Sequence, residues 1–163
     1  MSRVHFLADP HFGHRNILKY RTQFKSIGEH DNYIVERWNN AIGKNDTVYL
    51  LGDAAFTMES LEIIRSLRGQ KILIRGNHDT LNAAYYLWVF KDVLGSISYK
   101  NTWLSHIPIH PSEIRRKILN IHGHTHHKKI DDPMYFSVCC EQIDYRPIAW
   151  SEILKRTDNE VSW

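Results

Sequence analysis

The sequence has few cysteines and no long hydrophobic run. Its two cysteines, Cys139 and Cys140, are adjacent in a predicted strand, so their side chains should point to opposite faces and not bridge each other. This excludes a disulfide framework. The longest uninterrupted apolar stretch, 83–90, has eight residues, whereas a membrane span needs about 20. The chain reaches Asp9 too early for the apolar core of a secretory signal. We therefore expect no membrane span and a cytoplasmic location.

A large excess of one charge sign is also missing. Twenty-one basic and 18 acidic side chains leave a net charge of +3. This excess suits a phosphorylated ligand but is too small for a protein that coats nucleic acid. Hydrophobic residues at 42% and charged residues at 24% exclude a disordered chain. With 163 residues, one domain over 1–163 is expected.

Hydrophobic patterning predicts an α/β fold, because strands alternate with helices in the first half of the chain. The predicted order is strand 4–8, helix 31–42, strand 47–51, helix 57–68 with Thr57 as its N-cap, and strand 70–75. This order indicates βαβ units and a largely parallel sheet. The aromatic segment 85–90 is expected to be helical. Short strands near 96–100, 102–106, 118–122 and 134–140 suggest a second sheet, and a last helix near 151–156 is expected to be capped by Ser151.

Eleven histidines are the unusual feature of the composition, and several of them lie near aspartate and glycine. Polar clusters follow the ends of five predicted strands: Asp9-Pro10-His11, Gly52-Asp53, Gly76-Asn77-His78-Asp79, His106, and Gly123-His124-Thr125-His126. In α/β folds, loops that leave the carboxyl ends of strands converge over one crevice. The five clusters are therefore expected to meet at one site.

The residue types in these clusters indicate a metal site. Imidazole and carboxylate ligands without thiolate suit manganese, iron, zinc or nickel. The candidate ligands are Asp9, His11, Asp53, Asn77, His106, His124 and His126. Seven ligands are too many for one four-coordinate ion but fit two ions if one carboxylate bridges them. Two divalent cations, two carboxylates and a bridging hydroxide leave a charge of about +1, which attracts phosphate. Glycines before the ligands allow sharp turns of the backbone.

The order and spacing of these motifs resemble those of calcineurin-like metallophosphoesterases, from about residue 4 to residue 126. The resemblance implies that Asp9, His11, Asp53 and His126 bind one metal, and that Asp53, Asn77, His106 and His124 bind the other. It further implies that His78 contacts the phosphate and protonates the leaving oxygen. The implied fold is a two-sheet sandwich flanked by helices, here without a cap domain.

One departure from the protein-phosphatase branch of this family follows Gly52-Asp53. That branch has a further Asp-Arg-Gly there, whose carboxylate orients the acid histidine, whereas this chain has Ala54-Ala55-Phe56. The partner that orients His78 is therefore left open, with Asp79 as a neighbour that could face away. The missing arginine also argues against a phosphoserine or phosphothreonine phosphatase of that branch.

Several assignments have alternatives within the sequence. His106, which ends a predicted strand, is preferred over His110 as the ligand between the third and last motifs. His14 and Arg15 follow the first ligand loop and are candidates for substrate contact. His122 and His127 are read as neighbours of the ligands or surface groups. The aromatic segment 85–90 is read as core or dimer surface, with base stacking as the alternative, and the basic run 115–117 as a solvated face.

The function that we predict from the sequence is a phosphoesterase with two divalent metals, manganese being the metal expected first and iron, zinc or nickel the alternatives. A hydroxide between the metals would hydrolyse a small or terminal phosphate mono- or diester, for example a nucleotide. One alternative is a nuclease that acts on DNA or RNA ends. A non-catalytic scaffold that binds metals and partners is an alternative of another class. The sequence determines neither the natural substrate nor the oligomeric state.

Overall fold

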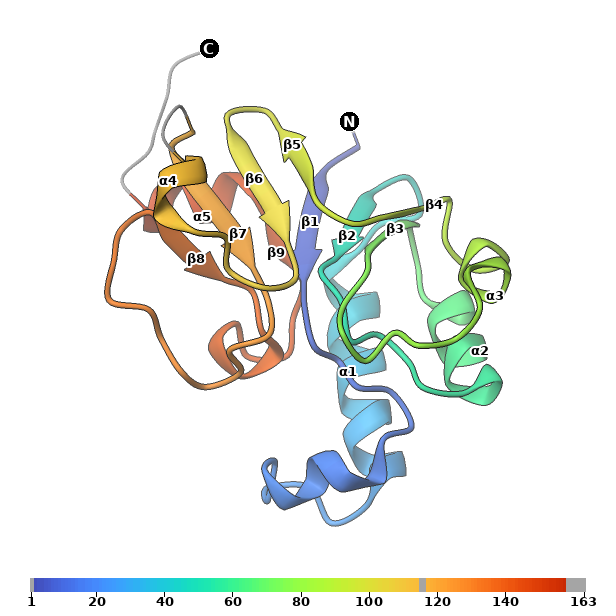
Figure 1. Ribbon diagram of the computed structural model, residues 1–163. Coiled ribbons are helices and arrows are strands. Elements are labelled where there is room, and N and C mark those ends of the chain that lie inside the picture. Colours follow the sequence, from blue (N-terminus) through green and yellow to red (C-terminus); the bar gives the residue numbers. More distant parts are fainter. Residues whose placement is uncertain (1, 115–116, 158–163) are drawn as a thin grey trace.

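Two β-sheets flanked by helices make up the computed structural model, which describes residues 2–114 and 117–157 (Figure 1). The strand order is β4-β3-β2-β1-β9 in the first sheet and β5-β6-β7-β8 in the second. The strands are β1 (Val4–Leu7), β2 (Thr47–Leu50), β3 (Gln70–Ile74), β4 (Asp92–Leu94), β5 (Ile97–Tyr99), β6 (Thr102–Ser105), β7 (Leu119–His122), β8 (Tyr135–Ser137) and β9 (Ile148–Ala149). The helices are η1 (Arg15–Lys19), α1 (Ile27–Ala41), α2 (Met58–Ser66), α3 (Ala83–Leu87), α4 (Pro111–Ile114), η2 (Cys140–Gln142) and α5 (Trp150–Arg156). The predicted α/β class with two sheets is confirmed.

The first sheet is largely parallel, as the sequence pattern predicted. Strands β1 to β4 pair in parallel, and β9 adds an antiparallel strand beside β1. The sequence analysis missed β4 and β9. These strands have three and two residues, which is too short for a period of two to be recognised.

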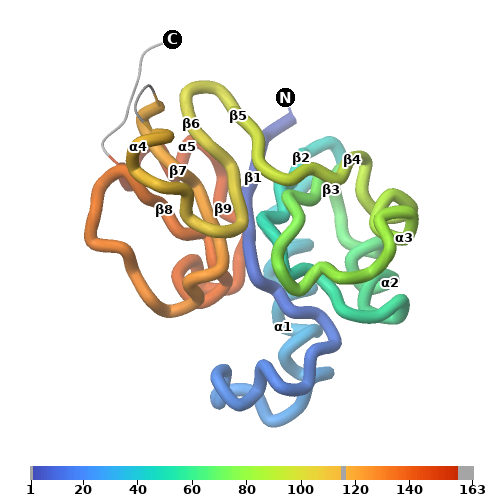
Figure 2. The backbone as a smooth tube through the Cα atoms, in the orientation of Figure 1, coloured from blue at the N-terminus to red at the C-terminus, as the bar shows by residue number. Residues whose placement is uncertain are grey.

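The second sheet has parallel strands β6, β7 and β8, with β5 antiparallel to β6. The predicted strand 134–140 is too long, because β8 ends at Ser137. Beyond it the backbone pairs with the end of β1 through the N–H of Ala8 and the carbonyl of Val138, 2.7 Å apart. The tube in Figure 2 shows this crossing, where the orange to red chain runs beside β1. Cys139 and Cys140 are therefore outside β8, and both are buried and free.

Two helices lie against the first sheet and have well-defined beginnings. Helix α1 begins at Ile27, four residues before the predicted start, because the Ser26 side chain accepts a hydrogen bond from the N–H of Glu29. Helix α2 has the predicted cap at Thr57, where the side chains of Thr57 and Ser60 form a reciprocal capping box. It ends at Ser66, two residues before the predicted end.

Two further helices differ from their predicted limits. In the aromatic segment the helix α3 covers only Ala83–Leu87, and the chain then turns and enters β4. Helix α5 begins at Trp150, with Ala149 at the N-cap and no side-chain bond there, so Ser151 does not cap it. The short strand β9, which ends at Ala149, fixes where this helix begins. Arg115 and Arg116 of the basic run lie outside the described residues.

The sheets pack together through an aromatic core. The Phe6 ring lies 5.7 Å from that of Tyr49, 5.8 Å from that of Tyr99 and 6.1 Å from that of Trp150. These residues come from β1, β2, β5 and α5, so one cluster joins both sheets. Among the described residues, no helix is long and apolar enough to cross a membrane.

Candidate metal centre

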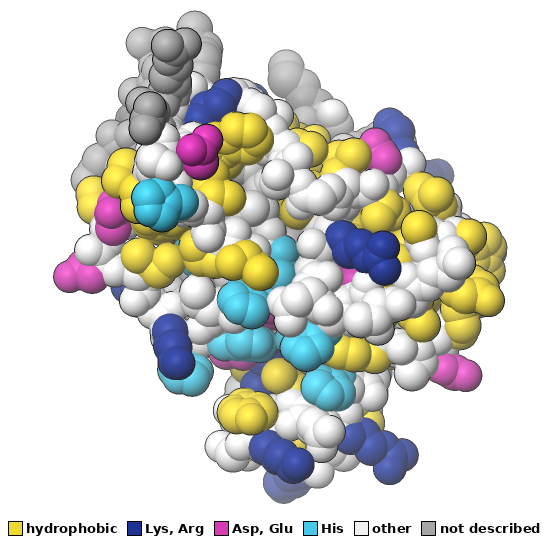
Figure 3. Space-filling view, viewed as in Figure 1, with side chains coloured by type: hydrophobic (Ala, Val, Ile, Leu, Met, Phe, Trp, Pro, Cys, Tyr) yellow, Lys and Arg dark blue, Asp and Glu magenta, His cyan; other side chains and the backbone are white. Residues whose placement is uncertain are grey.

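The predicted site residues lie at the carboxyl ends of five strands. Asp9 and His11 follow β1, Asp53 follows β2, Asn77 and His78 follow β3, His106 follows β6, and His124 and His126 follow β7. In the space-filling view, histidine side chains gather near the middle of one face (Figure 3). The expected convergence of the five loops is therefore seen in the fold.

Five of these residues have left-handed backbone conformations. The φ angles are 56° at Asp9, 53° at His11, 51° at Asp53, 69° at His124 and 51° at His126. Such angles are uncommon outside glycine, cost about 1–3 kcal/mol each, and cluster at functional sites. Backbone hydrogen bonds between the first two loops hold this geometry, from the N–H of Asp9 to Gly52 and from the N–H of His11 to Asp53.

The glycines beside the candidate ligands are needed mainly because a side chain there would clash with a neighbouring loop, and less because the backbone turns sharply. A Cβ atom on Gly123 would lie 2.6 Å from Oδ2 of Asp9, and one on Gly76 would lie 2.3 Å from Oδ1 of Asp53. Among Gly52, Gly76 and Gly123, only Gly52 has a positive φ, of 88°. The sharp turn expected at all three glycines is thus seen at Gly52, while Gly76 and Gly123 allow two ligand loops to touch.

Asp9, His11 and His126 form the first cluster of candidate ligands. One ligand atom from each lies within 4.8 Å of the other two. Oδ1 of Asp9 lies 3.8 Å from Nε2 of His11 and 3.9 Å from Nε2 of His126. Oδ1 of Asp9 and Nε2 of His11 are both buried without a hydrogen-bond partner. Buried polar atoms are rarely left unsatisfied, and a bound ion is one explanation for such a pair.

Asp53, His106 and His124 form the second cluster. Asp53 stands between the two clusters, because its Oδ2 lies 3.6 Å from Nε2 of His11 and its Oδ1 lies 3.5 Å from Nε2 of His106. Nδ1 of His106 lies 2.8 Å from the Leu51 carbonyl, which can only accept. The other ring nitrogen of His106, Nε2, is the one that faces Asp53, and it also lies 2.9 Å from Oδ1 of Asn77.

The spacing of the donors fits metal coordination. Two ligand atoms about 2.1 Å from one ion at a tetrahedral angle lie roughly 3.4 Å apart. Four contacts between ligand atoms, His11 and His126 with Asp9 and His11 and His106 with Asp53, are 3.5 to 3.9 Å long, beyond good hydrogen bonds. The donor set of imidazole, carboxylate and amide oxygen suits divalent metals.

Electrostatics favour the protonation states that metals need at His11, His124 and Asp9, whereas the hydrogen bond to Glu141 raises the pKa of His126 above its ordinary value. Burial lowers the pKa of His11 and that of His124, so both rings are neutral at neutral pH. Burial opposes ionisation of Asp9, but the neighbouring imidazole of His11, followed by those of His106 and His126, lowers its pKa below the ordinary value. Neutral imidazoles next to a carboxylate are ready ligands, because metal ions compete with protons.

Asp79 faces away from His78 and therefore is not the residue that orients the His78 ring. Its carboxylate accepts hydrogen bonds from the N–H groups of Asp53, Ala54 and Gly76, at 2.9, 2.8 and 2.8 Å. Asp79 therefore braces the loops after β2 and β3. The exposed His78 ring lies 5.7 Å from the ring of Phe56 and 6.0 Å from that of His11, so it overlooks the first cluster.

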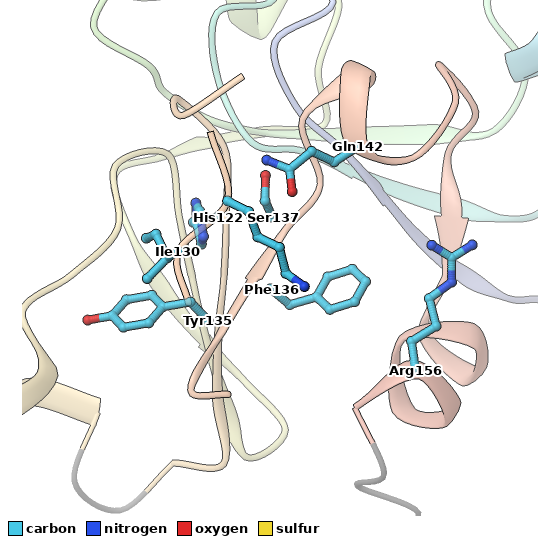
Figure 4. Close-up of a pocket in the computed structure, with 8 residues that line it drawn as sticks. His122, Ile130, Tyr135, Phe136, Ser137, Gln142 and Arg156 are labelled. Carbon is cyan, nitrogen blue, oxygen red and sulfur yellow. The ribbon is translucent and has the colours of Figure 1, made fainter. Parts of the chain in front are cut away.

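Other histidines are placed away from the clusters or beside them. His110 is exposed and bonds to Ser112, which supports the choice of His106. His122 is buried in β7, and its Nδ1 donates to the Gly123 carbonyl. It lines a separate hollow of about 320 Å³ between β8 and α5, together with Tyr135 and Arg156 (Figure 4). None of the predicted metal ligands is among the described residues that line this hollow.

A cleft of about 720 Å³ opens beside the first cluster. Its lining includes His11, His14, Lys19, Tyr20, His78, His124, His126, His127, Lys128 and Glu141. Tyr20 is 79% exposed and offers an aromatic face, flanked in sequence by Lys19. Arg15 is exposed and does not appear among the described residues of this lining.

Three residues near the site were missed by sequence reasoning. Arg21 is 1% exposed and Glu141 is largely buried, and the two are ion-paired at 2.9 Å. Cys139 is buried with its Sγ 3.3 Å from Oδ2 of Asp9, and burial raises the pKa of this thiol well above its ordinary value. None of the three lies in a motif, so the sequence held no local signal for them.

The sequence model of calcineurin-like phosphoesterases matches residues 2–161. The chain belongs to the calcineurin-like phosphoesterase family. This agrees with the resemblance inferred from the motifs and extends it to nearly the whole chain. The family acts on phosphoesters and binds divalent metals, and the two clusters are candidate metal sites.

Relatives of this member of the calcineurin-like phosphoesterase family come from archaea, phages and bacteria. An uncharacterized protein of Methanocaldococcus jannaschii is 28% identical, with 95% of this chain and 91% of that protein covered. The gene 66 protein of Mycobacterium phage L5 is 31% identical, with 97% and 92% covered. A crystal structure of a protein of unknown function from Aquifex aeolicus is 28% identical and has a TM-score of 0.80 over 96% of this chain and 100% of its own.

Proposed function

We propose that this chain is a dinuclear-metal phosphoesterase that hydrolyses small or terminal phosphate mono- or diesters. The observation that carries the proposal is the position of Asp53. Its two oxygens face different clusters, with Nε2 of His11 at 3.6 Å on one side and Nε2 of His106 at 3.5 Å on the other. One carboxylate can therefore serve two ions, which is the arrangement of two-metal hydrolases.

The residues would hold the metals in two sets that share Asp53. Asp9, His11, Asp53 and His126 form one set, and Asp53, Asn77, His106 and His124 form the other. Divalent ions bound there supply Lewis acidity and lower the pKa of water, which provides a nucleophile at neutral pH. Manganese is the metal that we propose, with iron, zinc and nickel as alternatives that also suit imidazole and carboxylate ligands.

Two side chains outside the ligand sets are proposed to contact substrate. His78 lines the cleft without belonging to either cluster, and we assign it the proton delivered to the leaving oxygen. His14 lines the same cleft, with its Nδ1 3.3 Å from Nδ1 of His11 and its ring stacked on Phe56 at 4.3 Å. A phosphate contact by His14 is thus supported by position, whereas the one predicted for Arg15 stays a prediction.

The cleft supports a small substrate. Its volume of about 720 Å³ is within the range of small-molecule sites, roughly 300–1,000 Å³. Lys19 and Lys128 in the lining attract an anion, and the exposed ring of Tyr20 offers a stacking face to a base. A nucleotide phosphoester is therefore the substrate class that we propose.

An activity panel tests the proposal. Chelator-treated protein is reloaded with Mn²⁺ and offered bis-p-nitrophenyl phosphate, p-nitrophenyl phosphate, 2′,3′-cyclic nucleotides and single-stranded DNA. We expect turnover of the small esters, and loss of it in Asp53→Asn together with metal from both sites. His126→Ala should lose mainly one metal per chain.

The alternatives give different results in the same panel. Cleavage of DNA strands in preference to the small esters would favour a nuclease. Absence of turnover with Mn²⁺, Fe²⁺, Zn²⁺ and Ni²⁺, with two metals bound, would favour a non-catalytic scaffold. A single tightly held metal in fully active protein would contradict the dinuclear site.

A further inference from the structure

Arg21 is a buried cation that contacts the Asp9-Pro10 loop, Glu141 and His30. Its guanidinium donates to the carbonyls of Asp9 and Pro10, at 2.7 and 3.2 Å, and to Oε1 of Glu141 at 2.9 Å. It also lies 2.8 Å from Nε2 of His30. A charge buried to 1% exposure is costly unless it is paired and hydrogen-bonded. These contacts satisfy it and tie the left-handed loop of Asp9 and His11 to Glu141.

Glu141 in turn contacts a predicted metal ligand. Its Oε1 lies 3.0 Å from Nδ1 of His126, so one carboxylate oxygen accepts both from Arg21 and from the His126 ring. Glu141 belongs to η2, which begins at Cys140, and the N–H of Cys140 donates to the Ala8 carbonyl at the end of β1. The carboxylate is thus fixed to the strand that carries Asp9.

This contact determines which nitrogen of His126 is free. A carboxylate can only accept, so Nδ1 of His126 carries a proton, and in the neutral ring Nε2 keeps its lone pair. Nε2 is the atom that lies 3.9 Å from Oδ1 of Asp9. Carboxylates that bond the second nitrogen of a ligating histidine fix its tautomer and orientation, and their loss typically costs 10–100-fold in metal affinity.

We propose that Glu141, held in place by Arg21, is a positioning residue that fixes the tautomer and ring orientation of His126 and thereby sets the metal affinity of the Asp9, His11 and His126 cluster. The inference rests on the proposed function, because it takes this cluster to be a metal site. Its effect is confined to one cluster. The other cluster has its own brace, since Nδ1 of His106 donates to the Leu51 carbonyl.

The first experiment measures Mn²⁺ binding by titration calorimetry on chelator-treated protein. Glu141→Gln should weaken one of the two sites about 10–100-fold and leave the other unchanged. Glu152→Gln is the matched control, because Glu152 also pairs with arginines, Arg146 and Arg156, but contacts neither cluster. Equal weakening of both sites, or unchanged binding in Glu141→Gln, would overturn the proposal.

A double-mutant cycle tests whether Glu141 acts through His126. In a His126→Ala background, Glu141→Gln should cause no further loss of Mn²⁺ affinity, because the ring that it positions is gone. Additive losses would show that Glu141 affects the site by another route and would overturn the proposed role. If wild-type protein binds none of Mn²⁺, Fe²⁺, Zn²⁺ and Ni²⁺, the proposed function fails as well. If the wild-type protein binds two metals and Glu141→Gln changes neither affinity, this inference fails while the proposed function stands.

The wild-type protein itself provides a readout that needs no stable variant. Long-range ¹H–¹⁵N NMR of the metal-free protein, at a pH where the His126 ring is neutral, reports the tautomer. We expect a protonated Nδ1 and an unprotonated Nε2. The opposite tautomer would contradict the proposal even if Glu141→Gln failed to fold.

Discussion

At the scale of single residues, the candidate site depends on side chains held neutral or ionised by their neighbours. Burial lowers the pKa of His11, and the imidazoles around Asp9 lower the pKa of that carboxyl despite its burial. The result is a buried carboxylate next to lone pairs that have no protein donor. A divalent cation bound between these groups would satisfy them.

His78 provides a residue-scale prediction about mechanism. General acid catalysis by a histidine contributes typically 10²–10⁴-fold, and only where the leaving group needs a proton. His78→Ala should therefore keep both metals and lose about 10²-fold or more on a nucleoside ester, with a much smaller loss on a p-nitrophenyl ester. Rates on both substrates and metal content of the same preparation check this. An equal loss on the two esters with intact metals would remove His78 from the acid role.

At the scale of elements, the site is held by contacts between the loops that follow the strands. Gly123 after β7 lies against Asp9 after β1, and Gly76 after β3 lies against Asp53 after β2. Asp79, in the loop after β3, accepts two hydrogen bonds from the loop after β2, at Asp53 and Ala54, and one from Gly76 in its own loop. The candidate metal ligands are therefore positioned by the packing of one loop on another.

Gly123→Ala should disturb the first cluster. The new Cβ would lie 2.6 Å from Oδ2 of Asp9 and 2.8 Å from the Leu51 carbonyl, so one of the loops must move. We expect a loss of about 1–3 kcal/mol in unfolding free energy and weaker binding of one metal per chain. Gly95→Ala is the matched control, because no atom lies within 4 Å of the Cβ position there. Unchanged metal binding in Gly123→Ala would contradict this prediction, because it would show that the two loops can separate without loss of metal affinity.

Asp46 links the opposite, amino-terminal ends of the first three strands. Its carboxylate accepts from the N–H groups of Arg3 and Gly43, at 2.8 and 2.9 Å, and its carbonyl accepts from Gln70. Burial of Asp46 opposes its ionisation, but these N–H donors, with help from the neighbouring His5 and Arg3, lower the pKa of Asp46 below its ordinary value of 3.8.

Asp46→Asn should therefore reduce stability in a pH-dependent way. A carboxyl whose pKa is lower in the folded protein stabilises it above its unfolded pKa and loses this contribution as pH falls through the folded pKa. We expect the variant to be about 2 kcal/mol less stable at pH 7, and the difference to shrink as pH falls below 3.8. Denaturant unfolding of metal-free protein at pH 7 and pH 3 measures this, with exposed Asp131→Asn as control. A difference that persists unchanged at pH 3 would contradict it.

At the scale of the whole molecule, net charge and cleft size both favour small substrates. A protein that neutralises 6–10 phosphates of DNA loses about 10³–10⁵ in affinity between 50 and 200 mM salt. A net charge of +3 and a cleft of about 720 Å³ are suited to one or two phosphates. We therefore expect KM for a cyclic nucleotide to rise only slightly over this salt range. Steep salt inhibition, together with cleavage of long single strands, would favour the nuclease instead.

The sequence by itself determined the fold class, the family and the set of candidate ligands. Local patterns carry this information, since buried strands read as apolar runs, Thr57 has the chemistry of an N-cap, and Asp9, Asp53 and His124 stand at strand ends next to glycine. The roles of those residues as metal ligands, and the single domain over 1–163, stay predictions.

Only the tertiary structure decided which groups hold the ligands in place. The bond between Arg21 and Glu141 spans 120 positions of sequence, and the direction of the Asp79 carboxylate depends on two loops from different strands. The limits of β4 and β9 depend on their neighbours in the sheet rather than on their own few residues. The physical reason is the same in each case. A buried polar group takes whichever partner the packing of distant segments brings within hydrogen-bond distance, and no periodicity along the chain records that partner.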